Sequence, residues 1–313
     1  MPTVVHTRLP RPVKSLFSLL IALVLCGANP FAQAAEPFLK PNDVVALIGG
    51  EDMVVASECG QLESLLIRAL PDYHLKFRSL AWEGDTVFEQ PRDLNYPALE
   101  KQLDEIAATV VIAQFGQMES LGGESKLPAF TAAYEKLIER IGGGGKRRIV
   151  LMAPATVSAG GLASTRFKAI AEYAGAIREI AGRHGLLFIP PNDRVELTAE
   201  NFRDGMHLSE SGHNAAASHT ADALGAGKRA GEFTSTDEFR LADSIRAKNR
   251  LWFHYSRPQN WAFLNGDRTT QPSSRDHLDP SKRWFPEEMK QWLPLIAAKE
   301  QEIWSLAAQI KSK

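Results

Sequence analysis

Five short apolar runs, separated by longer amphipathic stretches, constrain the fold of residues 41–225 more than any other feature. The runs are Val44–Ile48, Leu75–Leu80, Thr109–Phe115, Arg148–Ala153 and Leu186–Ile189. Each is rich in branched or aromatic apolar residues and lacks the alternating polarity of a strand with one face in water. Strands buried on both faces of a parallel sheet have this pattern. The sequence therefore predicts about five parallel strands.

The stretches between these runs have the spacing of helices. They are Glu58–Leu70, Ala98–Ala107, Leu127–Ile141 and Ser164–Arg183. In the first, leucines recur three and four residues apart, as on the buried side of a helix. The glycines at 142–145 end the third. Strands that alternate with helices in this way predict a three-layer α/β fold, with helices on both faces of the sheet.

The composition changes after about residue 226, which predicts a domain over residues 35–228 and an extension over residues 229–313. Thr236–Arg250 has the pattern of a polar helix, and Phe285–Ile310 that of a second helix, interrupted by Pro294. The tryptophans of this part are Trp252, Trp261, Trp284, Trp292 and Trp304. A free segment with these rings would expose a large apolar surface, so we expect the extension to pack on the domain. We also expect part of its irregular segment, residues 251–284, near the mouth of a cleft.

Residues 1–34 have the features of a secretory signal peptide. Arg8, Arg11 and Lys14 precede an apolar run from Leu16 to Ala28, and residues 32–34 are Ala-Gln-Ala, which suits a signal peptidase. The apolar run is short for a membrane span. We therefore expect an exported protein, periplasmic or extracellular, without a membrane span after cleavage; a retained anchor is the alternative.

The charge and cysteine content narrow the range of functions. Three of the 36 basic residues lie in residues 1–34, which leaves 33 against 37 acidic residues, a net charge of −4. This charge, without a basic cluster, argues against nucleic-acid binding. Cys59 is the only cysteine left after cleavage, so we expect no disulfide within the chain.

Polar residues follow four of the predicted strands at their carboxyl ends, where open α/β sheets form their sites. Gly49-Gly50-Glu51 follows the first strand and Trp82-Glu83-Gly84-Asp85 the second. Phe115-Gly116-Gln117-Met118-Glu119 follows the third, and an Asp-x-x-His pair, Asp204 and His207, lies after the fifth.

This arrangement resembles the SGNH (GDSL-type) hydrolase superfamily over about residues 41–224. The resemblance implies a flavodoxin-like αβα sandwich, to which the C-terminal helical and irregular extension is added. In that family a Gly-Asp-Ser turn holds the nucleophilic serine, and a glycine and a Gly-x-Asn motif form the oxyanion hole. Carried over, His207 is the base and Asp204 its orienting carboxylate, while Gly84 and Gly116 occupy oxyanion-hole positions. The segment from Lys248 to Asn260 resembles an extension of secreted bacterial members, whose substrates are usually assumed to be acylated glycans.

Two positions depart from the family pattern. Glu51 occupies the position of the nucleophilic serine, and Met118 that of the oxyanion-hole asparagine. Serine esterase chemistry needs a hydroxyl beside the base and donors directed at the developing oxyanion. Ser57 and Ser64 lie further along the chain, and Ser57 falls in the following helix, away from the turn. Ser120, next to the third block, is a slightly better candidate but still a poor replacement. We therefore expect an ion pair between Glu51 and His207 in place of a reactive dyad.

Several residues have two interpretations at this stage. His254, Arg257 and Asn260 either attach the extension to the domain or contact a ligand. Glu119 is either a ligand contact or, like Asp85, a loop residue that accepts hydrogen bonds from the backbone. The tryptophans are either packing anchors or sugar platforms. A metal ion held by Glu51, Asp204 and His207 is the rival of the ion pair, but we expect no metal and no cofactor.

Two functions follow as hypotheses. The first is an exported SGNH-fold protein that has lost ester hydrolysis and keeps its cleft for a glycan or another small molecule. The second is an active hydrolase on ester or carbohydrate substrates, with Glu51 as nucleophile or general base beside His207 and Asp204. A structural module of an export-linked complex is a third possibility that the sequence does not separate from the first.

Overall fold

Strands and helices alternate along the chain as the apolar runs predict. The computed structural model describes residues 1, 3, 37–191, 199–226 and 233–311. The strands are β1 (Val44–Gly49), β2 (Lys76–Ser79), β3 (Val110–Gln114), β4 (Arg148–Met152) and β5 (Leu187–Ile189). The helices are α1 (Glu51–Cys59), α2 (Gln61–Ala69), α3 (Leu99–Glu105), α4 (Leu127–Gly142), α5 (Gly161–Arg166), α6 (Ile170–His184), α7 (Glu210–Ala223), α8 (Thr236–Ser256), α9 (Trp261–Leu264), α10 (Trp284–Lys290) and α11 (Trp292–Lys311). Short 3₁₀ helices are η1 (Pro71–Tyr73), η2 (Glu119–Gly122), η3 (Glu124–Lys126), η4 (Ala199–Asn201) and η6 (Pro272–Ser274).

Some of the predicted features lie outside the described residues. The expected signal peptide does so apart from residues 1 and 3, and so does the expected boundary at residues 228 and 229. Residues 36–313 cluster into one compact unit. No helix in the described ranges is both long and apolar enough to cross a membrane.

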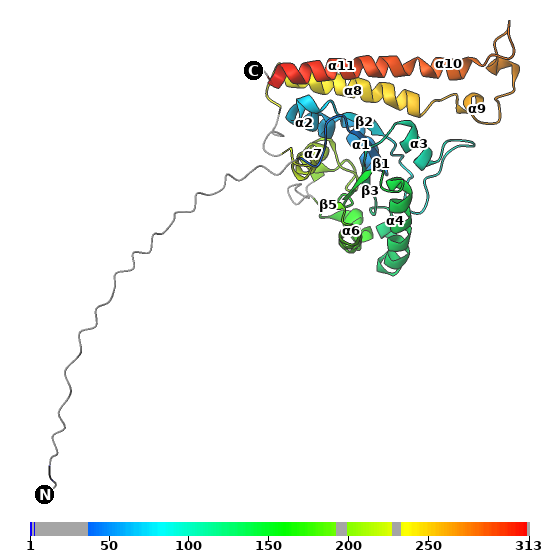
Figure 1. The fold of residues 1–313 in the computed structure, drawn as a ribbon. Helices are drawn as coiled ribbons and strands as arrows, with labels where there is room; N and C mark the ends of the chain where they lie inside the picture. The colour runs from blue at the N-terminus through cyan, green and yellow to red at the C-terminus, as the bar shows by residue number, and fades with distance from the viewer. Residues whose placement is uncertain (2, 4–36, 192–198, 227–232, 312–313) are drawn as a thin grey trace. The chain divides into compact units, whose positions relative to one another are not determined.

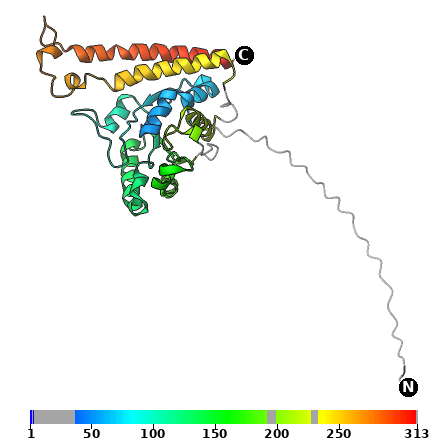
Figure 2. The same ribbon diagram turned by 180° about the vertical axis from the view of Figure 1, so that it is seen from behind.

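The described strands form one sheet in the order β2-β1-β3-β4-β5, and every neighbouring pair is parallel. β2 lies on one side of β1, and β3, β4 and β5 follow on the other side. Right-handed connections in these two directions place helices on both faces of the sheet. Figures 1 and 2 show α2 and α7 on one face and α4 and α6 on the other. The three-layer αβα fold is thus confirmed. The direction of chain progression reverses between β1 and β3, where such sheets form their crevice.

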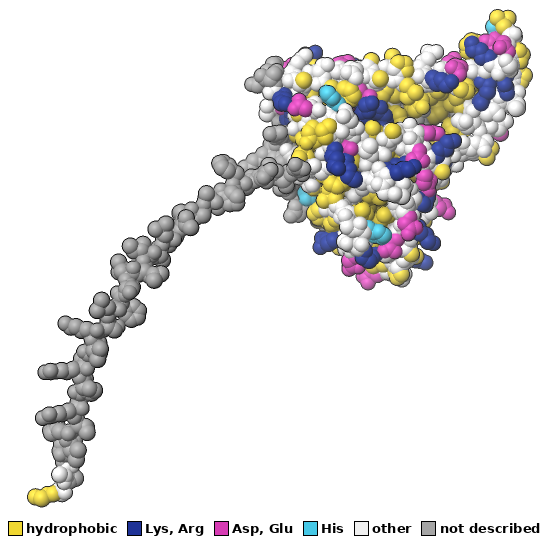
Figure 3. Space-filling view, in the orientation of Figure 1, with side chains coloured by type: hydrophobic (Ala, Val, Ile, Leu, Met, Phe, Trp, Pro, Cys, Tyr) yellow, Lys and Arg dark blue, Asp and Glu magenta, His cyan; other side chains and the backbone are white. Residues whose placement is uncertain are grey.

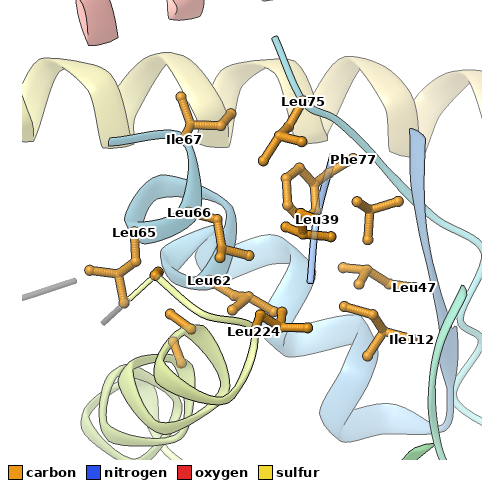
Figure 4. Close-up of a cluster of buried hydrophobic side chains, with 14 of the residues drawn as sticks. Leu39, Leu47, Leu62, Leu65, Leu66, Ile67, Leu75, Phe77, Ile112 and Leu224 are labelled. Atoms are coloured by element: carbon orange, nitrogen blue, oxygen red, sulfur yellow. The ribbon is translucent and has the colours of Figure 1, made fainter. Parts of the chain in front are cut away.

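A separate apolar core fills the space on each face of the sheet. Figure 4 shows the first, in which Leu62 of α2 lies with Leu47 of β1, Phe77 of β2 and Leu224 after α7. All four side chains are almost inaccessible to solvent. This core is built from α1, α2 and α7, and it fixes the position of α1, whose first residue is Glu51.

Three expected helices have different bounds in the structure. The expected helix Glu58–Leu70 begins at Gln61, because Gly60 adopts a left-handed conformation (φ 66°) that separates α1 from α2. The expected helix Ser164–Arg183 consists of α5 and α6. The expected helix Phe285–Ile310 is interrupted as predicted, but the break is at Gln291, between α10 and α11. Pro294 lies in the first turn of α11, where a missing N–H costs no helical hydrogen bond.

The extension packs on the domain through α8 and α11. In Figures 1 and 2 these two helices lie side by side above α2 and β2. Leu241 and Ile245 of α8 and Ile303 of α11 belong to the first core, as do two further residues of α11. Trp252 is 5% exposed, whereas Trp284 is 39% exposed; Trp261, Trp292 and Trp304 are half-buried. Of the five tryptophans, four are thus packed at least in part.

The C-terminal side chains also cover the free edge of the sheet. β2 is an edge strand, and the carbonyl groups of alternate residues there point away from β1. Each of four such carbonyls accepts a hydrogen bond from the extension: Leu75 from Trp304 (3.1 Å), Phe77 from Lys248 (3.2 Å), Ser79 from Trp252 (2.7 Å) and Ala81 from Arg257. The extension therefore satisfies an edge that could otherwise pair with another strand.

Candidate functional site

The residues expected at the site come together at the carboxyl ends of β1 and β3. Gly49 ends β1 with φ +153°, and a Cβ there would lie 2.5 Å from the carbonyl oxygen of Gln114 on β3. Only glycine fits this close approach of the two strands. Gly50 then precedes α1, and Glu51 is the first residue of that helix. Glu51 thus lies at the sharp turn from strand to helix, as predicted.

The loop before α7 presents His207 to this turn. Its ring Nδ1 lies 2.7 Å from one carboxylate oxygen of Asp204. The other oxygen of Asp204 accepts hydrogen bonds from the backbone N–H groups of Met206 (2.9 Å) and His207 (2.8 Å). Burial pushes the pKa of Asp204 upward, but the backbone and ring hydrogen bonds from His207 and that from Met206 lower it to about 2. Asp204 therefore stays ionised and orients the ring.

Glu51 faces the other nitrogen of that ring. Its Oε2 lies 3.1 Å from Nε2 of His207, and its Oε1 accepts a hydrogen bond from Arg203. Glu51 keeps 32% of its side chain exposed, whereas His207 keeps 10%. His207 therefore contacts a carboxylate through each ring nitrogen, at the position where a serine hydrolase would hold a neutral hydroxyl.

Asp52 belongs to the same cluster, although the sequence analysis did not single it out. Its carboxylate accepts a long hydrogen bond (3.4 Å) from the backbone N–H of Leu208 and is 8% exposed. Burial raises the pKa of Asp52 to about 6, against the attraction of His207. The contact ties α1 to the loop that carries His207. An acidic residue in the first turn of a helix normally indicates only a favourable helix-dipole contact, so no specific signal marks Asp52 in the sequence.

The oxyanion-hole positions are only in part available to a ligand. The N–H of Gly116 donates to Oε2 of Glu119 (2.8 Å), so it is already used. Gly84 is exposed, and within the described ranges its N–H has no hydrogen-bond partner. Met118 is 43% exposed and lines the cleft with a side chain that has no N–H to donate. Gln117, next to it, donates its amide to the backbone oxygen of Met206 (3.1 Å).

Glu119 has a positioning role in this structure. Its second oxygen accepts from the N–H of Val87 (2.8 Å), so one buried carboxylate joins the loops that follow β2 and β3. Burial raises the pKa of Glu119, although the hydrogen bonds from the backbone oppose this. With both oxygens bound to the backbone, Glu119 matches the loop-residue interpretation better than that of a ligand contact.

None of the three C-terminal candidates lines this cleft. Arg257 forms an ion pair with Glu83 (2.9 Å) and stacks on Trp82, which attaches the extension to the domain. His254 is exposed and stacks on Trp292, and Asn260 precedes α9. None of the described residues of 251–284 lines the cleft. Arg257 of this segment contacts Glu83, which lines the cleft, so part of the segment lies near the cleft, as expected, without lining it.

The cleft itself is small and rich in carboxylates. It has a volume of about 150 Å³. Its lining comprises Gly50, Glu51, Asp52, Met53, Glu83, Asp85, Gln114, Phe115, Gly116, Gln117, Met118, Glu119, Pro154, Ala155, Met206 and His207. This lining contains no serine, threonine, cysteine, tyrosine or lysine among the described residues. Ser120, the nearest alternative by sequence, is buried and donates to the carbonyl of Gln117 (2.6 Å).

The described residues contain no group of three or more His, Cys, Asp or Glu side chains placed to hold a metal ion. Both ring nitrogens of His207 instead contact carboxylates.

Comparisons with known proteins agree with this architecture. Residues 46–215 match the GDSL-like Lipase/Acylhydrolase family. The structure of a gut microbial diltiazem-metabolizing enzyme is similar with a TM-score of 0.56 and 12% identity, over 89% of this chain and 96% of that chain. This similarity extends over the C-terminal helices.

Two further solved structures are similar over a shorter part of the chain. A lipase/acylhydrolase from Enterococcus faecalis has a TM-score of 0.43 and 17% identity, over 58% of this chain and 95% of that chain. A catalytic mutant of an acetylxylan esterase from Geobacillus stearothermophilus has a TM-score of 0.46 and 16% identity, over 60% of this chain and 96% of that chain. No curated protein matches the sequence. Because the family match spans more than half of the chain and includes both Glu51 and His207, this protein belongs to the GDSL-like lipase/acylhydrolase family.

Proposed function

We propose that this family member has lost serine esterase activity and uses its cleft to bind a small hydroxyl-rich ligand, such as the end of a glycan. The observation that carries the proposal is the 3.1 Å contact between Glu51 and Nε2 of His207. In a serine hydrolase that nitrogen accepts the proton of the attacking hydroxyl. Here the side chain of Glu51 lies at that nitrogen, and no alcohol hydroxyl is present there to be activated.

The rest of the cleft supports the same conclusion. No hydroxyl or thiol lines it in the described chain, so nothing there replaces the missing nucleophile. Met118 removes one oxyanion donor, a loss that typically costs about 100-fold or more in rate. Losing the nucleophile costs far more and leaves only the contribution of binding and the remaining donors.

The lining also indicates the chemistry of the ligand. Glu51 and Glu83 expose 32% and 53% of their side chains, and carboxylate oxygens accept hydrogen bonds from hydroxyl groups. A volume of about 150 Å³ suits one sugar ring rather than a long chain. The proposal includes export, which the basic and apolar N-terminal segment of the sequence supports.

A carboxylate-based hydrolase is the second candidate. Glu51 is in part open to the cleft, as a nucleophile or general base must be. Its two oxygens are already engaged by Arg203 and His207, which favours the binding role.

The experiment that separates these functions measures hydrolysis of p-nitrophenyl acetate by the wild-type protein and three variants. We expect background rates for the wild-type protein and Glu51→Gln, a small gain for Glu51→Ser, and a further gain of about 100-fold for Glu51→Ser with Met118→Asn. Wild-type turnover that disappears in Glu51→Gln would establish the second candidate instead. No gain in the double variant would mean that the cleft has diverged beyond these two positions.

Ligand binding needs its own measurement, by thermal shift against acetylated and deacetylated oligosaccharides. We expect at least one of these oligosaccharides to raise the melting temperature of the wild-type protein. The same oligosaccharide should not raise the melting temperature of the double variant Glu51→Gln with Glu83→Gln. A complete lack of ligands in such a screen would contradict the binding role.

A further inference from the structure

A second and larger cavity lies between α1, β2 and α8, outside the candidate site. Its volume is about 440 Å³, against about 150 Å³ for the cleft. Its walls are apolar and mostly buried; they include Leu47, Val54, Phe77, Ala81 and Trp252. Met53 of α1 lines both cavities and separates them.

The polar groups inside this cavity already have partners in the protein. Ser57 donates to the carbonyl of Met53 (2.8 Å), and Asn249 donates to the carbonyl of Ser57 (2.8 Å). Glu63 contacts the ammonium group of Lys248 through both oxygens, at 2.8 and 2.9 Å. These side chains are thus engaged within the protein, and the apolar walls favour an apolar ligand.

The mouth of the cavity is basic along α8. Arg246, Arg250, His254 and Arg257 recur about once per helical turn, and all four line the cavity. Arg246 is paired with Asp243 (2.7 Å) and Arg257 with Glu83 (2.9 Å). Arg250 is exposed and has no hydrogen-bond or ion-pair partner in the described part of the chain.

An exposed carboxylate, Glu58 on α1, also borders the cavity. The residue two positions later, Gly60, lies against Arg246, so this carboxylate belongs to the end of the cavity near Arg246. The end near Arg250 and His254 is the basic one. Figure 3 shows hydrophobic side chains gathered along the paired C-terminal helices, with Lys and Arg side chains beside them.

We propose that this cavity binds a single-chain amphipathic anion, such as a free medium-chain fatty acid. The alkyl chain lies between α1 and α8, and the carboxylate pairs with Arg250 at the mouth. The site is independent of the proposed cleft function, because its residues come from the other side of Met53. Two residues expected to contact a ligand, His254 and Arg257, line this cavity and not the cleft.

The test uses bromine quenching of tryptophan fluorescence in the full mature protein. The probes are 11-bromoundecanoate and its uncharged analogue 11-bromoundecanol, below the concentration at which they form micelles. Trp252 lines the cavity, so a bound bromoalkyl chain quenches it. We expect saturable quenching by the acid, with an affinity about 2- to 5-fold higher than that of the alcohol, the range of an ion pair at a partly exposed site.

Three variants make the test specific. Arg250→Glu should remove the preference for the acid and leave the affinity for the alcohol unchanged. Glu58→Gln should leave the affinity for the acid unchanged or raise it. Arg240→Glu is the matched control, because it makes the same charge reversal on α8 at a residue that does not line the cavity.

A filling variant, Ala56→Phe, places a ring in the cavity and should abolish quenching by both probes. Calorimetric titration of the same variants provides a second measurement that does not depend on Trp252. The proposal is overturned by a lack of saturable binding to the wild-type protein, by equal affinity for acid and alcohol, or by wild-type binding in a folded Ala56→Phe protein.

Discussion

At the scale of single residues, Asp52 and His213 make the free energy of unfolding depend on pH in opposite directions. Both side chains interact electrostatically with His207. Burial raises the pKa of Asp52 from 3.8 to about 6. Burial, together with the nearby Arg203 and His207, lowers the pKa of His213 from 6.5 to about 4, and its Nε2 has no hydrogen-bond partner among the described residues. Folding therefore favours the neutral form of both side chains.

These two shifts oppose each other across the same range of pH. As the pH rises, the native state keeps the proton of Asp52 to a higher pH than the unfolded state does. The stabilisation of the native state by this protonation is therefore full below pH 3.8 and is lost as the pH rises through about 6. For His213 the unfolded state binds the proton first, so stability is lost as the pH falls from 6.5 to about 4. Each effect amounts to about 3 kcal/mol. In the wild-type protein they nearly cancel.

We predict that single substitutions reveal the two effects. Relative to the wild-type protein, the free energy of unfolding of Asp52→Asn should rise by about 3 kcal/mol between pH 4 and pH 6.5, and that of His213→Phe should fall by a similar amount. Urea unfolding at several pH values measures both. Asp93→Asn, at an exposed site, is the control and should give a flat difference. Parallel pH profiles for Asp52→Asn and the wild-type protein would contradict the assignment.

At the scale of secondary-structure elements, the covered edge of β2 leads to a prediction about tryptophan side chains. Trp252→Phe keeps an aromatic ring but leaves the carbonyl of Ser79 without its donor, so we expect a loss of about 1–3 kcal/mol in the free energy of unfolding. Trp304→Phe should cost less, because Trp304 is half-buried and water can replace its N–H at Leu75.

Trp284→Phe is the matched control for both substitutions. Its ring is 39% exposed and donates no hydrogen bond among the described residues. Chemical unfolding of the three variants measures the differences. If Trp252→Phe costs no more than Trp284→Phe, the edge carbonyls do not depend on these donors.

The sequence predicted the strands more accurately than the helix bounds or the contacts between distant elements. A strand buried on both faces is an uninterrupted apolar run, so each predicted strand lies within two residues of the observed one at either end. The break at Gly60 was missed because apolar residues keep helical spacing on both sides of it. The hydrogen bonds from the C-terminal extension to the edge of β2 were not predicted, because every residue has a backbone carbonyl group and the sequence does not show which of them need a donor.

The candidate site could be predicted in part for a related reason. Glu51, Asp204 and His207 could be found because motif order on a parallel sheet brings strand ends together. The burial of Asp52 depends on Leu208, which is 156 positions away in the chain, and the role of Glu119 depends on the N–H of Val87. Neither contact follows from local sequence. The same applies to the second cavity, whose walls come from elements far apart in the chain, among them α1, β2 and α8.

At the scale of the whole molecule, the C-terminal helices are part of the hydrophobic cores. Leu241, Ile245 and Ile303 belong to the core on one face of the sheet, and Trp252 and Ile296 to the core on the other. The prediction of a separate domain over residues 35–228 is therefore tested by removing the rest. The family match over residues 46–215 alone would suggest that the shorter chain folds by itself.

We predict the opposite for a chain that comprises residues 37–226 only. It loses the donors to the carbonyls of Leu75, Phe77, Ser79 and Ala81, and it exposes the apolar surface that α8 and α11 cover. An uncovered edge strand beside exposed apolar residues pairs with other chains. We therefore expect oligomers in sedimentation velocity and no cooperative thermal transition. Adding the separate segment 233–311 should reduce the self-association, since it restores both the donors and the apolar cover. A monomeric truncated protein that melts near the temperature of the full chain would show that the extension is a separate addition to a domain that is stable without it.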